Sequence, residues 1–459
     1  MNRRAFLNQL ATGAVTAGAF LWKWNGNLLA QEPTPPSAAG TPSPTEAGQA
    51  GQSAVPASDE LVVPENTEGW VTCRTITKGP KDHWGAYYDQ MHFDPTDRWV
   101  VGNEVDFRGR SPLPEDEIRV GLIDTQDGDR WCEIGRTRAW NWQQGPMFQW
   151  IPGRTTYEDA EVIWNDRDDQ EKRFFAHVYK PSTGQYRTLP HAVYVLSPDG
   201  RYALFPDFAR LNDTRPGYGY AGLPDPNRDV LTPKDAGLWR MDVLTGETKL
   251  LFSFADIADL DAPKEGYSKN AKHWFNHVLV APDSRRFLFL HRWRGETEGG
   301  SWKTRLITAN IDGTDPFVLN PTGMTSHLVW QDPTHVIAFA RQPSHGDRFY
   351  VFTDRTRESH VVGNDIMKVD GHVSYLPHTG KKWILNDTYP NRQRMQKVFL
   401  FEMATEREVV LREFFLPKEF KGEWRVDLHP RASHSGRKIL VDIVEDGKRQ
   451  IAMLELGKS

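Results

Sequence analysis

Cysteine is scarce in this chain of 459 residues, which contains only Cys73 and Cys132. One disulfide is therefore the most that the sequence allows, and a disulfide-based scaffold is excluded. A basic stripe is missing as well, because 61 acidic residues outnumber 56 basic ones and the net charge is -5. Nucleic-acid binding needs such a stripe to neutralise phosphates, so we expect no nucleic-acid partner.

Long apolar runs are also lacking. The run near the N-terminus, in "MNRRAFLNQLATGAVTAGAFLW", is too short and too rich in Gly, Ala and Thr for a membrane span. The pair Arg3-Arg4 before it is typical of a twin-arginine export signal, and "NLLAQE" offers a cleavage point after Ala30. We predict that residues 1–30 are this signal. The mature protein is then periplasmic or secreted and has no membrane span.

Residues 31–60 contain almost nothing to bury, since Pro, Ala, Ser, Thr and Gly dominate them. We interpret this stretch as a disordered linker. Aromatic residues, in contrast, make up 12% of the chain, with 17 tryptophans. Most should pack between sheets, and some should line a carbohydrate pocket, where flat rings cover flat sugar faces.

Helical periodicity is close to absent after residue 86, and a repeated unit takes its place. In each unit a short apolar strand, a tight turn and a second apolar strand are followed by another strand pair. The first turns of the units begin at Asp94, Pro152, Ser197, Pro282, Asp332, Pro377 and Ser433. Seven four-stranded units predict an all-β fold, a seven-bladed β-propeller over residues 61–459. A pair of β-sandwiches is the alternative.

The last unit stops at "RQIAMLEL", after only three strands. A propeller must close into a ring, and an unpaired edge strand invites aggregation. We therefore predict that the N-terminal segment "GWVTCRTIT", residues 69–77, supplies the missing outer strand.

Histidines recur at one register in four successive units, each five residues before a turn residue, which is Pro282, Asp332, Pro377 or His434. They are His277, His327, His372 and His429. The first strand of a propeller blade lines the central channel, and side chains alternate along a strand. Equal register therefore predicts that these four side chains converge at one mouth of the channel. A single histidine would more often be structural, and the repetition favours a functional site.

The connections between second and third strands open on that same face, and several combine arginine with aromatic residues. The residues that we expect to bind a substrate are His191, Arg210, Arg215, Tyr218, Tyr220, His277, Arg294 and Tyr389. Guanidinium groups and flat rings together suit an anionic, flat ligand such as a sugar acid. The expected partner is therefore an acidic oligosaccharide.

Three stretches around these histidines, "TSHLVW", "DGHVSYLPHTG" and "VDLHPRASHSG", resemble the oligogalacturonate lyase family. These are seven-bladed propellers that cleave short pectin fragments by β-elimination. The resemblance is strongest from about residue 270 to the end. It implies a catalytic base at His327, metal ligands at His372 and His429, and a pocket arginine at Arg305.

The chain departs from the family's final metal motif, a glutamine followed by His-Pro-His. Val426 stands at the position of the glutamine, and Arg431 stands at the position of the second histidine. The manganese-like divalent metal that the resemblance implies thus keeps two of four ligands. Alternatively, the guanidinium of Arg431 supplies the positive charge in place of the metal.

Together these features predict a lyase that cleaves uronate-containing, pectin-like oligosaccharides by β-elimination. His327 is the predicted base, and Arg305 and Arg431 are the predicted clamps on the uronate carboxylate. Tyr218 and Tyr220 are candidates for the general acid, and the sequence does not distinguish between them.

Two rival classes are considered. A non-catalytic, TolB-like periplasmic propeller is the main alternative, and it would need no converging histidines. A glycoside hydrolase would need two carboxylates across the pocket, and Glu423 and Asp427 have no matching acid in a second blade.

Overall fold

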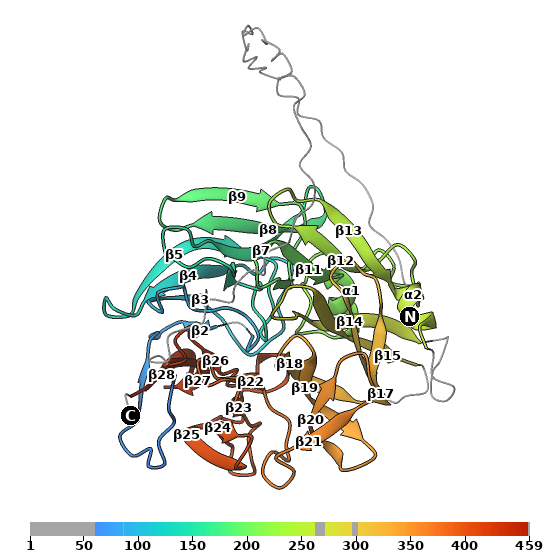
Figure 1. Ribbon diagram of the computed structural model, residues 1–459. Coiled ribbons are helices and arrows are strands. Elements are labelled where there is room, and N and C mark those ends of the chain that lie inside the picture. Colours follow the sequence, from blue (N-terminus) through green and yellow to red (C-terminus); the bar gives the residue numbers. More distant parts are fainter. Residues whose placement is uncertain (1–59, 86, 262–270, 296–301, 458–459) are drawn as a thin grey trace, which may run out of the picture. The chain divides into compact units, whose positions relative to one another are not determined.

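The computed structural model describes residues 60–85, 87–261, 271–295 and 302–457, which lie in the compact unit Pro56–Ser459. The predicted export signal and all but the last residue of the predicted linker lie outside the described residues. Seven four-stranded sheets follow one another around a ring (Figure 1). The predicted seven-bladed β-propeller is confirmed.

Blades one to six are each built from four consecutive antiparallel strands, beginning with the strand at the channel. In chain order, four per blade, these strands are β2 (Asp82–Trp84), β3 (Trp99–Val105), β4 (Ile118–Asp124), β5 (Arg130–Thr137), β6 (Gln149–Trp150), β7 (Val162–Asp168), β8 (Arg173–Lys180), β9 (Gln185–Leu189), β10 (Val195–Leu196), β11 (Tyr202–Pro206), β12 (Gly237–Asp242), β13 (Thr248–Ser253), β14 (Lys272–Val280), β15 (Arg286–Arg294), β16 (Lys303–Asn310), β17 (Phe317–Gly323), β18 (Thr325–Trp330), β19 (His335–Gln342), β20 (Gly346–Thr353), β21 (Ser359–Val362), β22 (Ser374–Tyr375), β23 (Trp383–Asp387), β24 (Met395–Glu402) and β25 (Arg407–Phe415).

Blade seven combines the two ends of the described chain. Its strands are β26 (Arg431–Ala432), β27 (Lys438–Glu445), β28 (Lys448–Leu456) and, outermost, β1 (Val71–Thr75). β1 pairs antiparallel with β28, and Val71 lies opposite Leu456. The N-terminal closing strand predicted within residues 69–77 is therefore present.

Burial decreases from the channel to the rim of each blade. In blade four, every residue of β15 except Arg294 is buried, whereas only Leu189 is buried in β9, the outermost strand of blade two. Inner strands are covered on both faces because neighbouring blades pack face to face. Tryptophan fills much of this space, as predicted. Fully buried examples are Trp84, Trp140, Trp142, Trp150, Trp164 and Trp274.

The two α-helices in the described ranges are short and lie in or beside the connections of blade three. α1 (Phe208–Thr214) follows β11, and α2 (Phe254–Asp259) follows β13. A 3₁₀ turn, Gly422–Trp424, precedes the channel strand of blade seven. None of the helices described here is long and apolar enough to cross a membrane. Both cysteines are free.

Candidate functional site

The structure brings together the four histidines that were expected to converge, His277, His327, His372 and His429. The ring centroids of His327 and His372 are 4.1 Å apart, and those of His372 and His429 are 4.3 Å apart. The His277 ring lies 6.1 Å from that of His327. Tyr87 lies among them, with its ring 4.7 to 6.4 Å from all four. All five side chains are buried, and we call this set the histidine group.

Irregularities in the channel strands aim these histidines at one another. The pairing of β14 with β15 shifts register around His277, and the pairing of β18 with β19 shifts around His327. Such β-bulges redirect side chains and are frequent next to functional sites. In blades six and seven, His372 and His429 each stand two residues before the channel strand begins.

Two of the four histidines also have strained backbones. His277 has φ of 50° and His429 has φ of 45°, in the left-handed region that favours glycine. A non-glycine residue held there costs energy, and such outliers cluster at active sites and ligand clamps. The same strain at equivalent positions of two blades points to a function for this mouth of the channel.

His327 is oriented by a carboxylate. Its Nδ1 lies 2.9 Å from Asp370 Oδ1, so Nδ1–H donates to Asp370 and the lone pair is on Nε2. Burial lowers the pKa of His327, and the attraction of Asp370 opposes this effect only in part. The imidazole is therefore neutral at pH 7 and able to accept a proton.

His372 has the opposite electrostatic balance. Burial alone would lower its pKa, but the carboxylate of Asp387, 2.9 Å from Nδ1, outweighs burial and raises the pKa above its usual value. Asp387 also accepts from the backbone N–H of both His372 and His429. This one carboxylate fixes the orientation of the His372 ring and leaves its Nε2 facing inward without a partner among the described residues.

His372, Asp427 and His429 together fit a metal ion, since one ligand atom from each lies within 4.8 Å of the others. Among the described residues, His372 Nε2, Asp427 Oδ1 and both ring nitrogens of His429 have no hydrogen-bond partner. The nearest group to His429 Nδ1 is Asp442, at 4.0 Å, beyond hydrogen-bond reach. Buried polar atoms without partners are rare and costly. Imidazole and carboxylate ligands suit a divalent transition metal. Asp427 is therefore a third candidate ligand beside the two predicted histidines.

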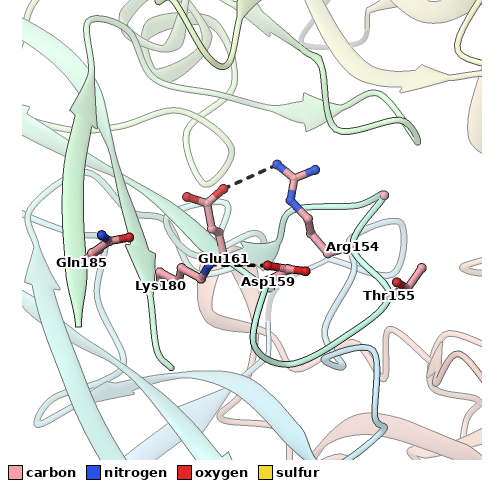
Figure 2. Close-up of a pocket in the computed structure, with 7 residues that line it drawn as sticks. Arg154, Thr155, Asp159, Glu161, Lys180 and Gln185 are labelled. Atoms are coloured by element: carbon pink, nitrogen blue, oxygen red, sulfur yellow. Dashed lines mark ion pairs between the residues drawn. The ribbon is translucent and has the colours of Figure 1, made fainter. Parts of the chain in front are cut away.

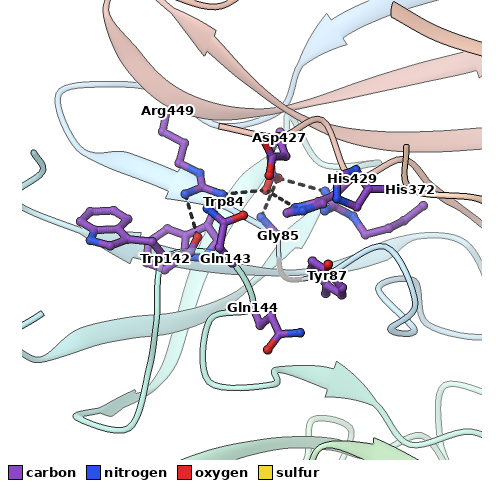
Figure 3. A network of polar contacts seen from close by, with 12 residues as sticks. Trp84, Gly85, Tyr87, Trp142, Gln143, Gln144, His372, Asp427, His429 and Arg449 are labelled. Atoms are coloured by element: carbon purple, nitrogen blue, oxygen red, sulfur yellow. Dashed lines mark hydrogen bonds and ion pairs between the residues drawn. The ribbon is translucent and has the colours of Figure 1, made fainter. Parts of the chain in front are cut away.

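A network of buried charged side chains lies next to this candidate metal site (Figure 3). Asp442 accepts from the guanidinium groups of Arg431, at 3.0 Å, and Arg449, at 3.2 Å. A side chain at Gly85 would begin 2.6 Å from the Arg431 guanidinium, so any larger residue there would require this guanidinium to shift. Arg431, predicted to be a carboxylate clamp, thus shares one carboxylate with Arg449 beside the candidate metal site.

Three other predicted substrate-binding residues border the histidine group. The Tyr389 ring lies 5.7 Å from that of His372, and the Tyr218 ring lies 6.0 Å from that of His277. The guanidinium of Arg215 covers the Tyr218 ring at 3.8 Å. A fourth, Arg294, is the last residue of β15.

Two predicted arginines have structural partners instead. Arg305, expected as a clamp, donates to the carbonyls of Ile257 and Leu260 at the end of α2, at 2.8 and 2.7 Å. Arg210, on α1, pairs with the buried Asp225 and donates to several loop carbonyls. Both side chains are completely buried. These contacts hold loops together and do not fit a role in gripping substrate.

Tyr220 and His191 also lie apart from the histidine group. Tyr220 stacks on Phe208 with ring centroids 4.3 Å apart, and its hydroxyl accepts from Asn165, so it belongs to the core. This contact argues against Tyr220 as the general acid. His191 stacks on Phe205 in blade three.

Sequence reasoning missed several residues of the site. Tyr87 and Tyr88 precede the first turn of blade one, near the register of the histidines, and this spacing was the available signal. Asp370 stands two residues before His372, but nothing in its surroundings indicates a histidine partner. Asp387 ends the second strand of blade six, a position that no pattern distinguishes.

A separate surface pocket of about 360 Å³ lies entirely within blade two (Figure 2). Its charged residues pair with one another, Arg154 with Glu161 at 3.5 Å and Lys180 with Asp159 at 3.6 Å. Because these charges are mutually satisfied, the pocket gives no indication of a ligand.

Comparisons with known proteins give a fold and no family. No protein-family model and no curated protein matches this chain. Among solved structures, an oligogalacturonate lyase from Vibrio parahaemolyticus has a TM-score of 0.51 at 12% identity, over 83% of this chain and 93% of that one. An oligogalacturonate lyase in complex with manganese has a TM-score of 0.51 at 13% identity, over 84% and 93%. Propellers of peptidases and of a WD40 protein also match, with TM-scores below 0.5. At this identity the likeness shows the propeller fold alone.

Proposed function

We propose that this protein is a lyase that cleaves uronate-containing, pectin-like oligosaccharides by β-elimination. The observation that carries the proposal is the buried histidine group. It places a neutral histidine, oriented by a carboxylate, beside three residues that fit a divalent cation. The likeness to two oligogalacturonate lyases supports the proposal at the level of fold.

β-Elimination next to a uronate carboxylate has three requirements. A base removes the proton from C-5, the electron pair of that bond forms the C-4–C-5 double bond, and the oxygen at C-4 leaves and gains a proton. His327 suits the first step, because its Nε2 carries a lone pair and its ring is held by Asp370. Carbon acids next to a carboxylate need charge stabilisation as well as a base.

That charge stabilisation is assigned to a divalent cation, of which manganese is the example that a structural neighbour provides. His372, Asp427 and His429 would hold it. When bound, it would neutralise the uronate carboxylate and so acidify the proton at C-5. Asp387 fixes the tilt of the His372 ring, which is the role that a carboxylate often has behind a metal-binding histidine.

The proton for the leaving oxygen is assigned to Tyr389. Its ring is 6.2 Å from that of His327, and the residue is half-buried at the edge of the histidine group. Burial, followed by the nearby Asp427 carboxylate, raises the pKa of Tyr389 far above its usual value, so the phenol keeps its proton at neutral pH. Tyr218, the acid candidate from the sequence, accepts a hydrogen bond from Arg425 and remains the second choice.

The test is a panel of uronate oligosaccharides followed by ultraviolet absorbance of the unsaturated product, with and without manganese. We expect product from at least one oligosaccharide with wild-type protein, and formation that is roughly 10²- to 10⁴-fold slower with His327→Gln. Binding without product in every condition would instead favour a non-catalytic propeller of the TolB-like kind.

We also propose that the protein is exported through the twin-arginine pathway, on the basis of Arg3-Arg4 and the linker composition. Mass spectrometry of the mature N-terminus should place the cleavage next to Ala30. An intact N-terminus on protein from the cytoplasm would contradict export.

A further inference from the structure

A cavity of about 610 Å³ lies at the turn end of the channel strands, and all seven blades contribute residues to it. Trp330 and Tyr375, which line it, are the last residues of β18 and β22. Each stands three residues after a histidine of the histidine group, which places it about 10 Å further along the channel. We call this space the turn-side cavity.

Tyr88 separates the turn-side cavity from the histidine group. Its ring lies 5.3 Å from that of His372 and 5.8 Å from that of His327, and the residue also lines the cavity. The Tyr88 hydroxyl accepts from the backbone N–H of Leu328, at 3.0 Å, and donates to the carbonyl of the same residue, at 2.9 Å. These two hydrogen bonds fix the ring between the two spaces. The cavity is therefore distinct from the candidate metal site.

One of the residues that line the cavity carries a carboxyl group, and this residue is Asp89. Both of its side-chain oxygens are buried and have no hydrogen-bond partner in the part of the chain that the structure describes. The Oγ of Ser374, another lining residue, is likewise buried without a described partner. A buried carboxylate without donors is costly, because it exchanges several hydrogen bonds with water for none. The cavity thus contains acceptors that a ligand with N–H groups would satisfy.

The wall of the cavity suits an apolar body that carries a positive charge. Trp330 and Tyr375 are buried in the wall together with aliphatic side chains such as Leu196 and Leu279. The faces of aromatic rings attract cations. Lys381 already shows this attraction, since its Nζ lies 5.4 Å from the centroid of the Tyr375 ring.

Basic side chains also line the cavity, and these are Arg154, Lys381, Arg431 and His434. Arg154 pairs with Glu161 at 3.5 Å. Arg431 donates to Asp442 at 3.0 Å. Lys381 stands at an exposed position, where water and salt screen its charge. A ligand inside the cavity would therefore meet the buried carboxylate more strongly than these cations.

We propose that the turn-side cavity binds an organic amine, whose ammonium group donates to Asp89 and whose apolar body packs against Trp330 and Tyr375. An ammonium group has three donors and no acceptor, which matches the carboxylate oxygens and the Ser374 hydroxyl. The volume lies within the range of about 300 to 1,000 Å³ that is usual for small-molecule sites. This site takes a ligand of opposite charge to a uronate, and it does not depend on the proposed lyase activity.

The experiment is a calorimetric titration of phenethylamine and of hexylamine into the whole protein at pH 8. Burial raises the pKa of Asp89 to about 7, so its carboxyl group is largely ionised at this pH. Asp89→Asn should weaken binding by about ten- to a hundredfold, the usual worth of a charge-assisted hydrogen bond. Asp365→Asn, whose side chain is 83% exposed between β21 and β22, is the matched control and should leave affinity unchanged.

Two further measurements locate the amine and identify the group that binds it. Asp370→Asn, beside His327 at the other end of the channel, should leave affinity unchanged. The alcohol 2-phenylethanol, which has the same ring and no charge, should bind at least about tenfold more weakly than phenethylamine. Asp89→Asn should keep the melting temperature of wild type or raise it, because it removes a costly buried charge.

Several results would overturn the proposal. Weaker binding in Asp370→Asn but not in Asp89→Asn would place the amine at the histidine group. Equal affinity for 2-phenylethanol would mean that the carboxylate takes no part in binding. A large fall in the melting temperature of Asp89→Asn would assign this carboxyl group a structural role. Absence of binding by both amines at millimolar concentration would exclude the site.

Discussion

Two sets of buried polar side chains in this propeller differ in whether the chain itself satisfies them. In the first set, Arg210 and Arg305 are fully desolvated, but carbonyls and a carboxylate accept their hydrogen bonds. In the second set, His372, His429 and Arg292 have buried nitrogens without partners among the described residues. Burial is alike in the two sets, and arginine occurs in both.

The difference lies in what surrounds the donors. A satisfied buried arginine joins two loops and has no hydrogen-bonding capacity left for a ligand. A buried arginine without hydrogen-bond partners destabilises the folded chain, and a ligand that accepts its hydrogen bonds removes this destabilisation on binding. The second set is found at one mouth of the channel and beside it, which is where a ligand would complete the hydrogen bonds.

The largest effect should come from His327. His327→Gln should lower turnover by roughly 10²- to 10⁴-fold, the usual worth of a positioned base, while the melting temperature stays nearly unchanged. Steady-state assays of product absorbance with thermal unfolding as a control would measure both. Full activity in the variant would exclude His327 as the base. Loss of folding would mean that His327 has a structural role, as Arg210 and Arg305 do.

Arg210 and Arg292 give the most direct test of the contrast. Arg210→Met should lower the free energy of unfolding by about 3 kcal/mol, because it leaves loop carbonyls and the buried Asp225 without their guanidinium partner. Asp225 would keep Lys272, at 3.5 Å, and the backbone N–H of Asn227, at 2.8 Å. Arg292→Met should cost nothing. Urea unfolding of the two variants would reveal this difference, and equal losses would mean that the two sets are not distinct.

Metal binding should raise stability by a smaller amount. With free manganese at a hundredfold excess over its dissociation constant, the folded state should gain about 2.7 kcal/mol relative to chelator-treated protein. His429→Gln and Asp427→Asn should abolish this gain, whereas His191→Gln, outside the histidine group, should preserve it. A manganese-dependent shift that survives both site variants would place the ion elsewhere.

The fold could be predicted from the sequence because each blade repeats the same turn chemistry and alternation. The closing strand followed from counting three strands in the last unit, and β1 occupies that position. The convergence of the histidines followed from register alone. In each case the information is local to a strand or a turn, which is why a single sequence carries it.

The rest of the site depends on contacts between segments that are distant in the chain. Arg305 was assigned to the pocket, but its donors meet the carbonyls at the end of α2, more than forty residues earlier. Asp427 becomes a candidate ligand only when blade seven brings it near His372 of blade six. Tyr87 lies in a segment that precedes the histidine-bearing blades. Apart from the spacing of Tyr87 before the first turn of blade one, no sequence spacing indicates these contacts.

The smallest effect concerns Asp89, another side chain with unpartnered buried oxygens in the described structure. Burial raises its pKa from 3.8 to about 7. The folded state therefore holds this proton more tightly than the unfolded state, and the stability associated with it is lost as pH rises from about 4 through about 7. Asp89→Asn should gain at least about 1 kcal/mol over wild type between pH 5 and pH 8, one pKa unit's worth. If the free energies of unfolding of Asp89→Asn and of wild type changed in parallel with pH, the raised pKa of Asp89 would be contradicted.

The positive φ angles of His277 and His429 have a consequence for mutational tolerance. If these two positions were randomised, the backbone conformation would decide which substitutions still fold. Glycine, asparagine and aspartate enter the left-handed region readily, and β-branched residues do not. Valine or isoleucine would therefore be depleted there by folding itself. At His327 and His372, whose φ angles are ordinary, the same residues would fold and be lost only under selection for activity.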